Sequence, residues 1–222
     1  MAFDGTAIEC ARNIYYGCSD VLHYGPNKSI ARVAGQCRPA SDWVGASMII
    51  GIISDTHGFV HRAIFDAFRG VDAIVHAGDV GDVGVIEQLK TIAPTYAVRG
   101  NIDGGDLYSL DKILYQSFDG VRVTVTHNAG DLIRPAWDIE SRILTRPTDI
   151  LISGHYHAYW CAPLQTSTGR ILWLSPGAAG NSGHHQQRMA LRLTIADKAR
   201  RTGDIVNDIQ LETVKFGARG EA

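Results

Sequence analysis

The sequence has no long apolar run, no leader pattern and no large excess of charge of either sign. No apolar stretch approaches the roughly 20 residues that a membrane-spanning helix needs, so we expect no membrane partner. The opening residues, MAFDGTAIEC, carry neither a basic nor an apolar segment, so we expect no signal peptide. The formal net charge of -2 gives no electrostatic reason to expect nucleic acid as a partner. These absences favour a cytoplasmic globular protein.

Standard thiolate metal sites are also missing. The four cysteines, Cys10, Cys18, Cys37 and Cys161, form no C-x-x-C pair, and their spacing matches no common zinc pattern. Reduced thiols in a cytoplasmic protein are therefore the expected state. A hydrophobic fraction of 45% and a charged fraction of 20% suit a globular chain of one or two domains.

Residues 1–47 differ from the rest of the chain because they show no sustained period of 2 or 3.6. A segment without a patterned apolar face has little to offset the entropy lost on ordering. We therefore expect this N-terminal extension to be poorly ordered and dispensable, with Met48 as the functional start. An added strand or a partner-binding arm is the alternative. The main domain is predicted over residues 48–216, followed by a tail over 217–222.

From Met48 onward, strand-like and helix-like patterns alternate in the order β-α-β-α-β, which predicts a largely parallel sheet with crossover helices. The expected strands cover 48–53, 73–78 and 95–98, and the expected helices cover 60–69 and 82–93.

The second half of the chain consists mainly of strand-like runs. One helix is expected at WDIESRIL, residues 137–144, and the tripeptide at 118–120, FDG, predicts a tight hairpin turn. The expected strands cover 112–118, 121–127, 149–154, 170–175 and 189–195, and residues 207–216 are expected to form one more edge strand.

Polar side chains follow the carboxyl ends of five of these strands, usually beside a glycine. In open α/β sheets, ligands bind at the carboxyl ends of strands, so residues that are far apart in the sequence can converge there. The converging residues would be Asp55, His57, Asp79, Asn101, His127, His155 and His157, with Asp103 beside Asn101.

Imidazoles, carboxylates and an amide oxygen, with no thiolate, suit divalent ions such as manganese, iron, nickel or zinc. Seven donors are too many for one tetrahedral zinc ion. They suit two metals if one carboxylate bridges, and metals about 3.5–4 Å apart are a device for in-line attack on phosphorus.

Each motif taken alone has a simpler explanation. Asp79 could be the N-cap of the helix that follows it, and Asn101 and Asp103 could build a turn. His155 and His157 could be solvated loop residues. The ordered occurrence of all five motifs at strand ends is what favours a metal site.

The ordered set D-x-H, G-D, G-N-x-D, H and G-H-x-H resembles the calcineurin-like metallophosphoesterase superfamily. The segments GIISDTHG, HAGD, RGNID, SGHYH and SPGA, between residue 48 and about residue 195, resemble its small YfcE-type phosphodiesterases. The resemblance implies an α/β fold, with two mixed β-sheets in a sandwich flanked by helices and a dinuclear metal centre between them.

Position by position, the resemblance implies one metal bound by Asp55, His57 and His157. It implies a second metal bound by Asn101, His127 and His155, with Asp79 bridging the two. Manganese is the ion expected first, with iron, nickel or zinc as alternatives. The catalytic residues would be Asp79, Asn101 and Asp103.

Three positions depart from the family pattern. Ile102 stands where many members have a histidine that can assist the leaving group. Asn128 follows His127 in place of the usual glycine, and Ser175 stands where asparagine is common. Only the first departure bears on chemistry, because isoleucine cannot donate a proton.

The resemblance implies a divalent-metal-dependent phosphoesterase, with phosphodiesters favoured over protein phosphates. A hydroxide held between the metals, with its pKa lowered by them, would attack phosphorus. The substrate would be a small phosphodiester or phosphomonoester, and a homo-oligomer is open. A catalytically weak scaffold, as in a retromer subunit with this fold, and a metal-binding phosphate sensor are the alternatives.

Other residues receive weaker expectations. His76, inside a strand, is expected to be a core residue or to support a ligand. His61 is expected to be solvated. His184 and His185 follow the glycine-rich segment GAAGNSG and are expected on a surface loop, with a position near a site as the alternative. Arg134 is a residue that could meet a phosphate.

Overall fold

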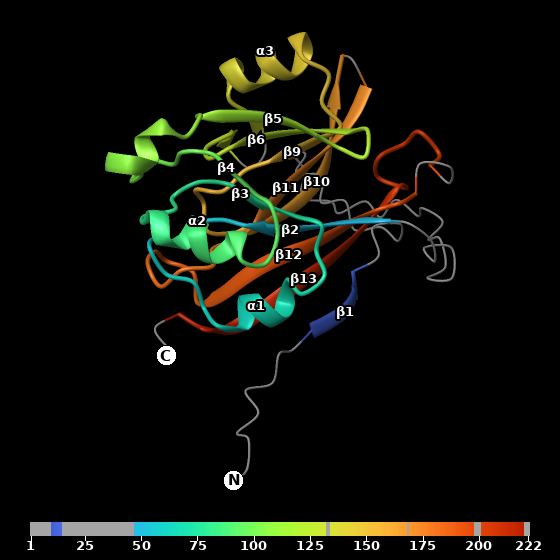
Figure 1. Cartoon of the computed structure of the whole chain (residues 1–222). Helices are drawn as coiled ribbons and strands as arrows, with labels where there is room; N and C mark the ends of the chain where they lie inside the picture. Colours follow the sequence, from blue (N-terminus) through green and yellow to red (C-terminus); the bar gives the residue numbers. More distant parts are fainter. Residues whose placement is uncertain (1–9, 15–46, 132–133, 168, 198–200, 220–222) are drawn as a thin grey trace, which may run out of the picture.

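The computed structural model describes residues 10–14, 47–131, 134–167, 169–197 and 201–219. Within them, two mixed β-sheets pack face to face, with α3 on the outer side of one sheet and α1 on the outer side of the other (Figure 1). The helices are α1 (Ala63–Ala67), α2 (Val83–Lys90) and α3 (Trp137–Thr145), with a 3-10 helix η2 at Gly105–Ser109.

The strand order explains how distant segments meet. The six-stranded sheet runs β1 (Cys10–Ile14), β13 (Ile209–Ala218), β12 (Gln187–Ile195), β2 (Met48–Ile53), β3 (Ala73–His76) and β4 (Thr95–Ala97). The five-stranded sheet runs β10 (Tyr159–Thr166), β11 (Gly169–Pro176), β9 (Ile150–Ile152), β6 (Val121–Thr126) and β5 (Ile113–Phe118). A small ribbon pairs β7 (Gly130–Asp131) with β8 (Arg134–Pro135). The two-sheet prediction is confirmed.

Side chains of the central strands alternate between two apolar layers. In β2, Ile50 and Ile52 face the core between the sheets, whereas Ile53 packs outward with residues of α1 and α2. Because both faces are buried, the run MIIGII is continuously apolar and does not alternate with polar residues. A Cβ at Gly51 would lie 2.9 Å from the ring of Phe68, so glycine is needed where the chain after α1 packs on the strand.

The parallel pairs are those on which the site depends. β2 pairs with β3 and β3 with β4 in parallel, as the β-α-β-α-β pattern predicts. In the other sheet β6 pairs with β9, and β9 with β11, also in parallel. The hairpin between β5 and β6 closes at Asp119 and Gly120, whose φ values of 47° and 83° match the favoured type I′ turn. The hairpin prediction is confirmed.

Several predicted boundaries differ from the structure. The sequence patterns predict no strand over 159–166, but β10 forms there; it is an edge strand, a position that tolerates Pro163. The helix predicted over 60–69 is α-helical only in α1, with turns on either side. β13 extends to Ala218 and so includes the first two residues of the predicted tail. It is not the edge strand that was expected, because it lies between β1 and β12.

Most of the N-terminal extension lies outside the described residues. The exception is β1, which pairs antiparallel with β13 and forms the added strand that was the alternative to a poorly ordered segment. That the extension is dispensable stays a prediction. The side chains of Cys10, Cys18 and Cys37 are also outside the described part.

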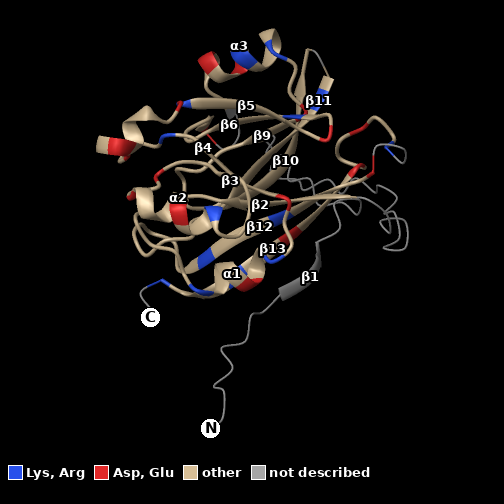
Figure 2. Ribbon diagram, in the orientation of Figure 1, with Lys and Arg blue, Asp and Glu red and all other residues tan. Residues whose placement is uncertain are grey.

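Membrane-spanning helices and the distribution of charge were the two features that the composition addressed. Among the described residues, no helix is long and apolar enough to cross a membrane. Acidic and basic residues are interspersed over the helices and loops (Figure 2), in keeping with the small net charge.

Candidate metal centre

The predicted polar residues lie just beyond the ends of parallel strands. Asp55 and His57 follow β2, Asp79 follows β3 and Asn101 follows β4. His127 follows β6, and His155 and His157 follow β9, so the opposite sheet contributes three imidazoles. The site therefore sits where both sheets end.

Two groups of ligand atoms form at this end of the sandwich. The first group is Asp55, His57 and His157, and the second group is Asp55, Asp79 and His127. Within each group, one ligand atom per residue lies within 4.8 Å of the others. Nε2 of His157 is 3.2 Å from Oδ1 of Asp55 and 3.4 Å from Nε2 of His57. These separations leave each set of donors converging on a common point.

Asp79 belongs to the second group and also faces the first. Its Oδ1 is 3.3 Å from Nε2 of His127, and its Oδ2 is 3.9 Å from Nε2 of His57. Oδ1 also accepts the backbone N–H groups of Asn101 and Ile102. The carboxylate is thus held by the loop after β4 and faces a histidine of each group, as a bridging ligand would.

Asn101 and His155 adjoin the second group. The side-chain nitrogen of Asn101 is 3.2 Å from Nδ1 of His155, whose ring meets the ring of His127 edge-on at 5.2 Å between centroids. The backbone N–H of His155 points at the carboxylate of Asp55. All seven predicted ligands are therefore brought together.

The backbone of the site is strained. Six non-glycine residues among those described have positive φ, and five of them are predicted ligands; the sixth, Asp119, is in the hairpin turn. Each such conformation costs about 1–3 kcal/mol and persists at functional sites. The five are Asp55, His57, Asp79, His155 and His157.

Two glycines allow the strand ends to approach one another. A Cβ at Gly100 would lie 2.1 Å from both the backbone nitrogen and Oδ1 of Asp79. A Cβ at Gly154 would lie 2.0 Å from Oγ of Ser54. Any side chain at either position would push the loops that carry the ligands apart.

His127 shows that the donor set fits a cation. Nδ1–H of His127 donates to the carbonyl of Ala77 at 2.8 Å, so the second nitrogen, Nε2, carries a lone pair in the neutral ring. Nε2 is buried and makes no hydrogen bond, although it lies 3.3 Å from a carboxylate oxygen of Asp79. A bare lone pair facing a carboxylate is repulsive unless positive charge lies between them. The residues present therefore fit a divalent cation.

The charges of the site agree with this. Burial alone would raise the pKa of Asp79, but the contact with His127 and two backbone N–H groups lower it to about 2. Burial lowers the pKa of His127, but the contact with Asp79 and the charge of Asp55 raise it overall. A cation bound at this pair would compete with protonation of His127, because metal ligands bind in their deprotonated form.

Asp103 and His76 support the site from behind. Asp103 accepts the backbone N–H groups of Gly81 and Gly100 with its two oxygens, at 2.8 and 2.7 Å, and so ties two ligand-bearing loops together. Nε2 of His76 is 2.9 Å from Oγ1 of Thr56, and its Nδ1 accepts the N–H of Gly78. Both ring nitrogens of His76 are used, so the structure gives it a supporting position.

The two histidines that follow the glycine-rich segment lie in different environments. Nδ1 of His185 is 3.2 Å from Nδ1 of His157, so this loop residue lies near the site, while His184 is exposed as expected. Their order after a glycine-rich segment is the only sequence signal for this contact. His61 is half-buried against the ring of Phe216 and not simply solvated. The side chain of Arg134 lies outside the described part.

The sequence matches a family profile and two named relatives. The profile of the calcineurin-like phosphoesterase superfamily domain matches residues 48–198. A probable metallophosphoesterase of Methanocaldococcus jannaschii is 36% identical over 143 residues, which cover 61% of this chain and 70% of that protein. A probable metallophosphoesterase of Methanothermobacter thermautotrophicus is 32% identical over 139 residues, covering 59% of this chain and 77% of that protein.

Solved structures share the fold. A conserved Streptococcus pneumoniae protein, described as a predicted phosphoesterase, matches with a TM-score of 0.52 at 22% identity, covering 69% of this chain and 86% of that one. Wild-type Vps29 from Entamoeba histolytica complexed with zinc matches with a TM-score of 0.54 at 16% identity, covering 77% of this chain and 100% of that one. These structures show the fold, whereas the profile and the sequence relatives show the family: the chain belongs to the calcineurin-like phosphoesterase superfamily.

Proposed function

We propose that this protein is a phosphoesterase that uses two divalent metal ions to hydrolyse small phosphodiesters. The observation that carries the proposal is the position of Asp79, whose two carboxylate oxygens face His127 and His57, one histidine from each group. One metal would be held by Asp55, His57 and His157, with Asp79 shared between the two. The other would be held by Asn101, His127 and His155.

The ions, when bound, would supply Lewis-acid activation of a water molecule and of the phosphoryl oxygens. Side chains of the protein would position the ligand-bearing loops and supply the negative charge of the centre. Asp103 fixes the loops after β3 and β4 by accepting two of their backbone N–H groups. The two buried carboxylates, Asp55 and Asp79, give the centre the negative charge that two divalent cations need.

A side chain that could protonate the leaving group is missing next to Asn101. Ile102 occupies that position and is half exposed, while its backbone N–H is used by Asp79. Asp103 is buried and accepts two hydrogen bonds, which favours a positioning role over that of an acid. We therefore propose diesters whose leaving groups depart without a proton as the best substrates.

The proposal can be tested with chelator-treated protein that is reloaded with manganese, iron, nickel or zinc. We expect turnover of bis(p-nitrophenyl) phosphate well above that of the free ion, and slower turnover of p-nitrophenyl phosphate. Asp79→Asn should be inactive, whereas Asp106→Asn, which changes an exposed carboxylate on η2, should match the wild type.

Two other results would replace the proposal. Metal binding without turnover of either ester would favour a scaffold of this fold. Tight binding of inorganic phosphate by the metal-loaded protein, again without turnover, would favour a phosphate sensor. Equal activity of Asp79→Asn and the wild type would contradict the metal assignment itself.

A further inference from the structure

One ligand histidine is held by another histidine. Nδ1 of His157 lies 3.2 Å from Nδ1 of His185, and Nε2 of His185 lies 3.0 Å from the carbonyl oxygen of Gly180. The two rings stand at 60° with centroids 5.2 Å apart. His185 therefore connects a predicted ligand to the backbone of the loop between β11 and β12.

The series of hydrogen bonds from His157 through His185 to the carbonyl of Gly180 is called the relay below. Its donors and acceptors can be assigned because its last member is a carbonyl oxygen. The carbonyl of Gly180 can only accept, so Nε2 of His185 must carry a hydrogen. In a neutral ring Nδ1 of His185 is then an acceptor, and the hydrogen between the two rings belongs to Nδ1 of His157. That assignment leaves Nε2 of His157 as a bare lone pair, facing Oδ1 of Asp55 at 3.2 Å.

The loop that carries Gly180 is itself hydrogen-bonded to the site. The backbone N–H of Gly180 donates to the carbonyl of Asp55 at 3.0 Å. A Cβ at Gly180 would lie 2.2 Å from the carbonyl oxygen of Thr56, so this loop is pressed against the strand end that bears the first group. A Cβ at Gly183 would lie 1.9 Å from Nδ1 of His157, which shows how closely the loop surrounds that ring.

His127 offers a comparison within the same site. It reaches a backbone carbonyl, that of Ala77, directly with its Nδ1–H. His157 instead reaches the carbonyl of Gly180 through His185. Ligand histidines generally donate their second ring N–H to such a partner, which fixes the tautomer and the ring orientation.

We infer that His185 is a positioning residue: it holds His157 in the tautomer that turns Nε2 toward the first group, and so supports the metal bound there. This inference rests on the proposed metal centre but not on the proposed reaction. His185 touches neither the second group nor, through any described contact, a substrate position.

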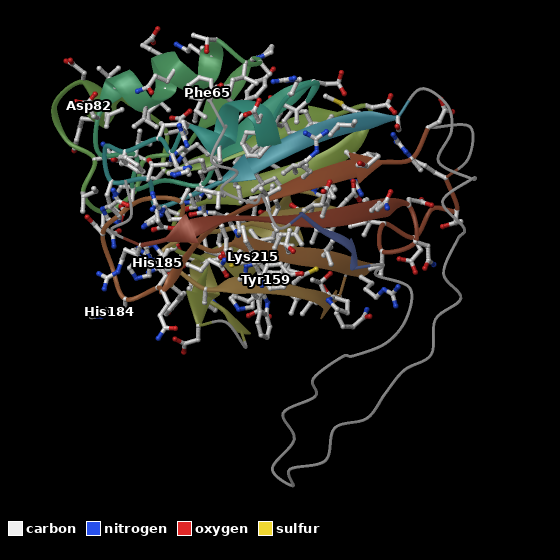
Figure 3. All side chains as sticks on the ribbon, turned by 90° about the horizontal axis from the view of Figure 1, so that it is seen from below. Phe65, Asp82, Tyr159, His184, His185 and Lys215 are labelled. Atoms are coloured by element: carbon white, nitrogen blue, oxygen red, sulfur yellow. The ribbon has the colours of Figure 1, made fainter. Side chains whose placement is uncertain are left out.

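The neighbouring residue is a matched control. His184 is exposed, whereas His185 is half-buried against His157. Figure 3 labels both histidines on the same loop, with His184 at the edge of the molecule and His185 further in. A change at His184 removes an imidazole from the same loop without touching the relay.

The test is to titrate manganese into chelator-treated protein and to measure its binding by calorimetry, without any substrate. His185→Ala should weaken one of the two binding steps by about 10- to 100-fold, the loss typical for a partner of a ligand histidine. The other step should be unchanged, and His184→Ala should match the wild type in both. Thermal unfolding of the metal-free variants should be unchanged, because the fold does not depend on the relay.

Two conservative variants separate the relay from simple packing. In His185→Asn the side-chain oxygen can take the place of Nδ1 and accept from His157, so binding should be largely restored. In His185→Gln the side-chain nitrogen can keep the bond to Gly180 but loses the acceptor for His157, so it should resemble His185→Ala.

The reverse order, with glutamine active and asparagine defective, would overturn the inference in favour of loop anchoring. Equal loss in both binding steps, or no loss in any variant, would also overturn it. Because turnover is not measured, a failure here is distinct from a failure of the proposed phosphodiester hydrolysis.

Discussion

The two ends of the β-sandwich both carry clusters of charged residues, but only one cluster is balanced by the chain itself. At the end opposite the metal centre, a cavity of about 250 Å³ is lined by Arg122, Arg170 and Arg201. These arginines pair with Asp149, Asp204 and Asp119 respectively.

At the other end, carboxylates and imidazoles converge in two ligand groups. Asp55 and Asp79 are buried, and a buried lone pair of His127 faces one of them without a hydrogen bond. The arginine end needs nothing further, because each guanidinium has its counter-ion and remains partly exposed. Under the proposed function the metal end is complete only when a cation is added, and this is the difference between the two ends.

The largest effect should come from Asp79→Asn. The amide oxygen can still accept the N–H groups of Asn101 and Ile102, so the fold should survive. It cannot supply a negative charge to both groups, so turnover of an aryl diester should fall to background. Diester kinetics, with circular dichroism as the control for folding, give the comparison. Near-normal turnover in this variant would mean that the cluster at Asp79 does not need a cation, and the contrast with the arginine end would fail.

The next effect concerns the leaving group. With Ile102 beside Asn101, aryl diesters should be cleaved faster than alkyl diesters by roughly the 10²–10⁴-fold that acid assistance is worth. The measurement is turnover across a series of diesters of rising leaving-group pKa. Ile102→His should flatten the series. A series that is already flat in the wild type would show that another group acts as the acid.

A smaller effect should appear in the free energy of unfolding at acidic pH. Burial is the main reason that the pKa of His76 is lowered from 6.5 to about 4. A lowered pKa means that the unfolded chain binds the proton first, so stability is full above pH 6.5 and falls as the pH drops toward 4. The loss should be on the order of 3 kcal/mol. Urea unfolding of metal-free protein at several pH values measures it.

His76→Gln serves as the comparison for the acid effect, because it removes the titrating ring and keeps polar atoms near Thr56 and Gly78. The slope of stability against pH should be shallower in this variant. Identical slopes would mean that other groups, such as the pair of Asp79 and His127, account for the acid sensitivity.

The smallest effect should come from the arginine end. Arg122→Ala removes the bonds to Asp149, but Arg122 is 53% exposed on its side chain, so water and salt screen the pair. Exposed pairs contribute about 0.2–1 kcal/mol, which corresponds to a fall in Tm of at most about 4 °C for a domain of this size. Turnover should not change. A large loss of activity would show that the two ends are coupled.

The convergence of the ligands could be predicted because each donor directly follows a strand. Asp55, Asp79 and His127 are placed by local patterns that a single sequence displays. The hairpin turn at Asp119 could also be predicted from the sequence, because Asp-Gly is a dipeptide that such a turn favours. The positions of these residues at strand ends and the hairpin turn are confirmed, whereas the role of the residues as metal ligands stays a prediction.

Other features depend on contacts that leave no local pattern. His185 meets His157 across 28 positions of sequence, from a loop without periodicity. Asp55 and His57 have positive φ values; Asp and His are residue types that tolerate this region, but the sequence does not indicate which of them adopt it. β10 was missed because Pro163 argues against a strand unless the strand is known to lie at an edge.

The central claim is that this chain holds a pair of divalent ions at the carboxyl ends of its strands. The most direct measurement is the number of manganese ions bound per chain when chelator-treated wild-type protein is titrated by calorimetry and checked by elemental analysis. The account predicts two ions per wild-type chain, and weakened binding of both in Asp79→Asn, because that carboxylate is shared. One ion or none in the wild type, or undiminished binding in the variant, would contradict it.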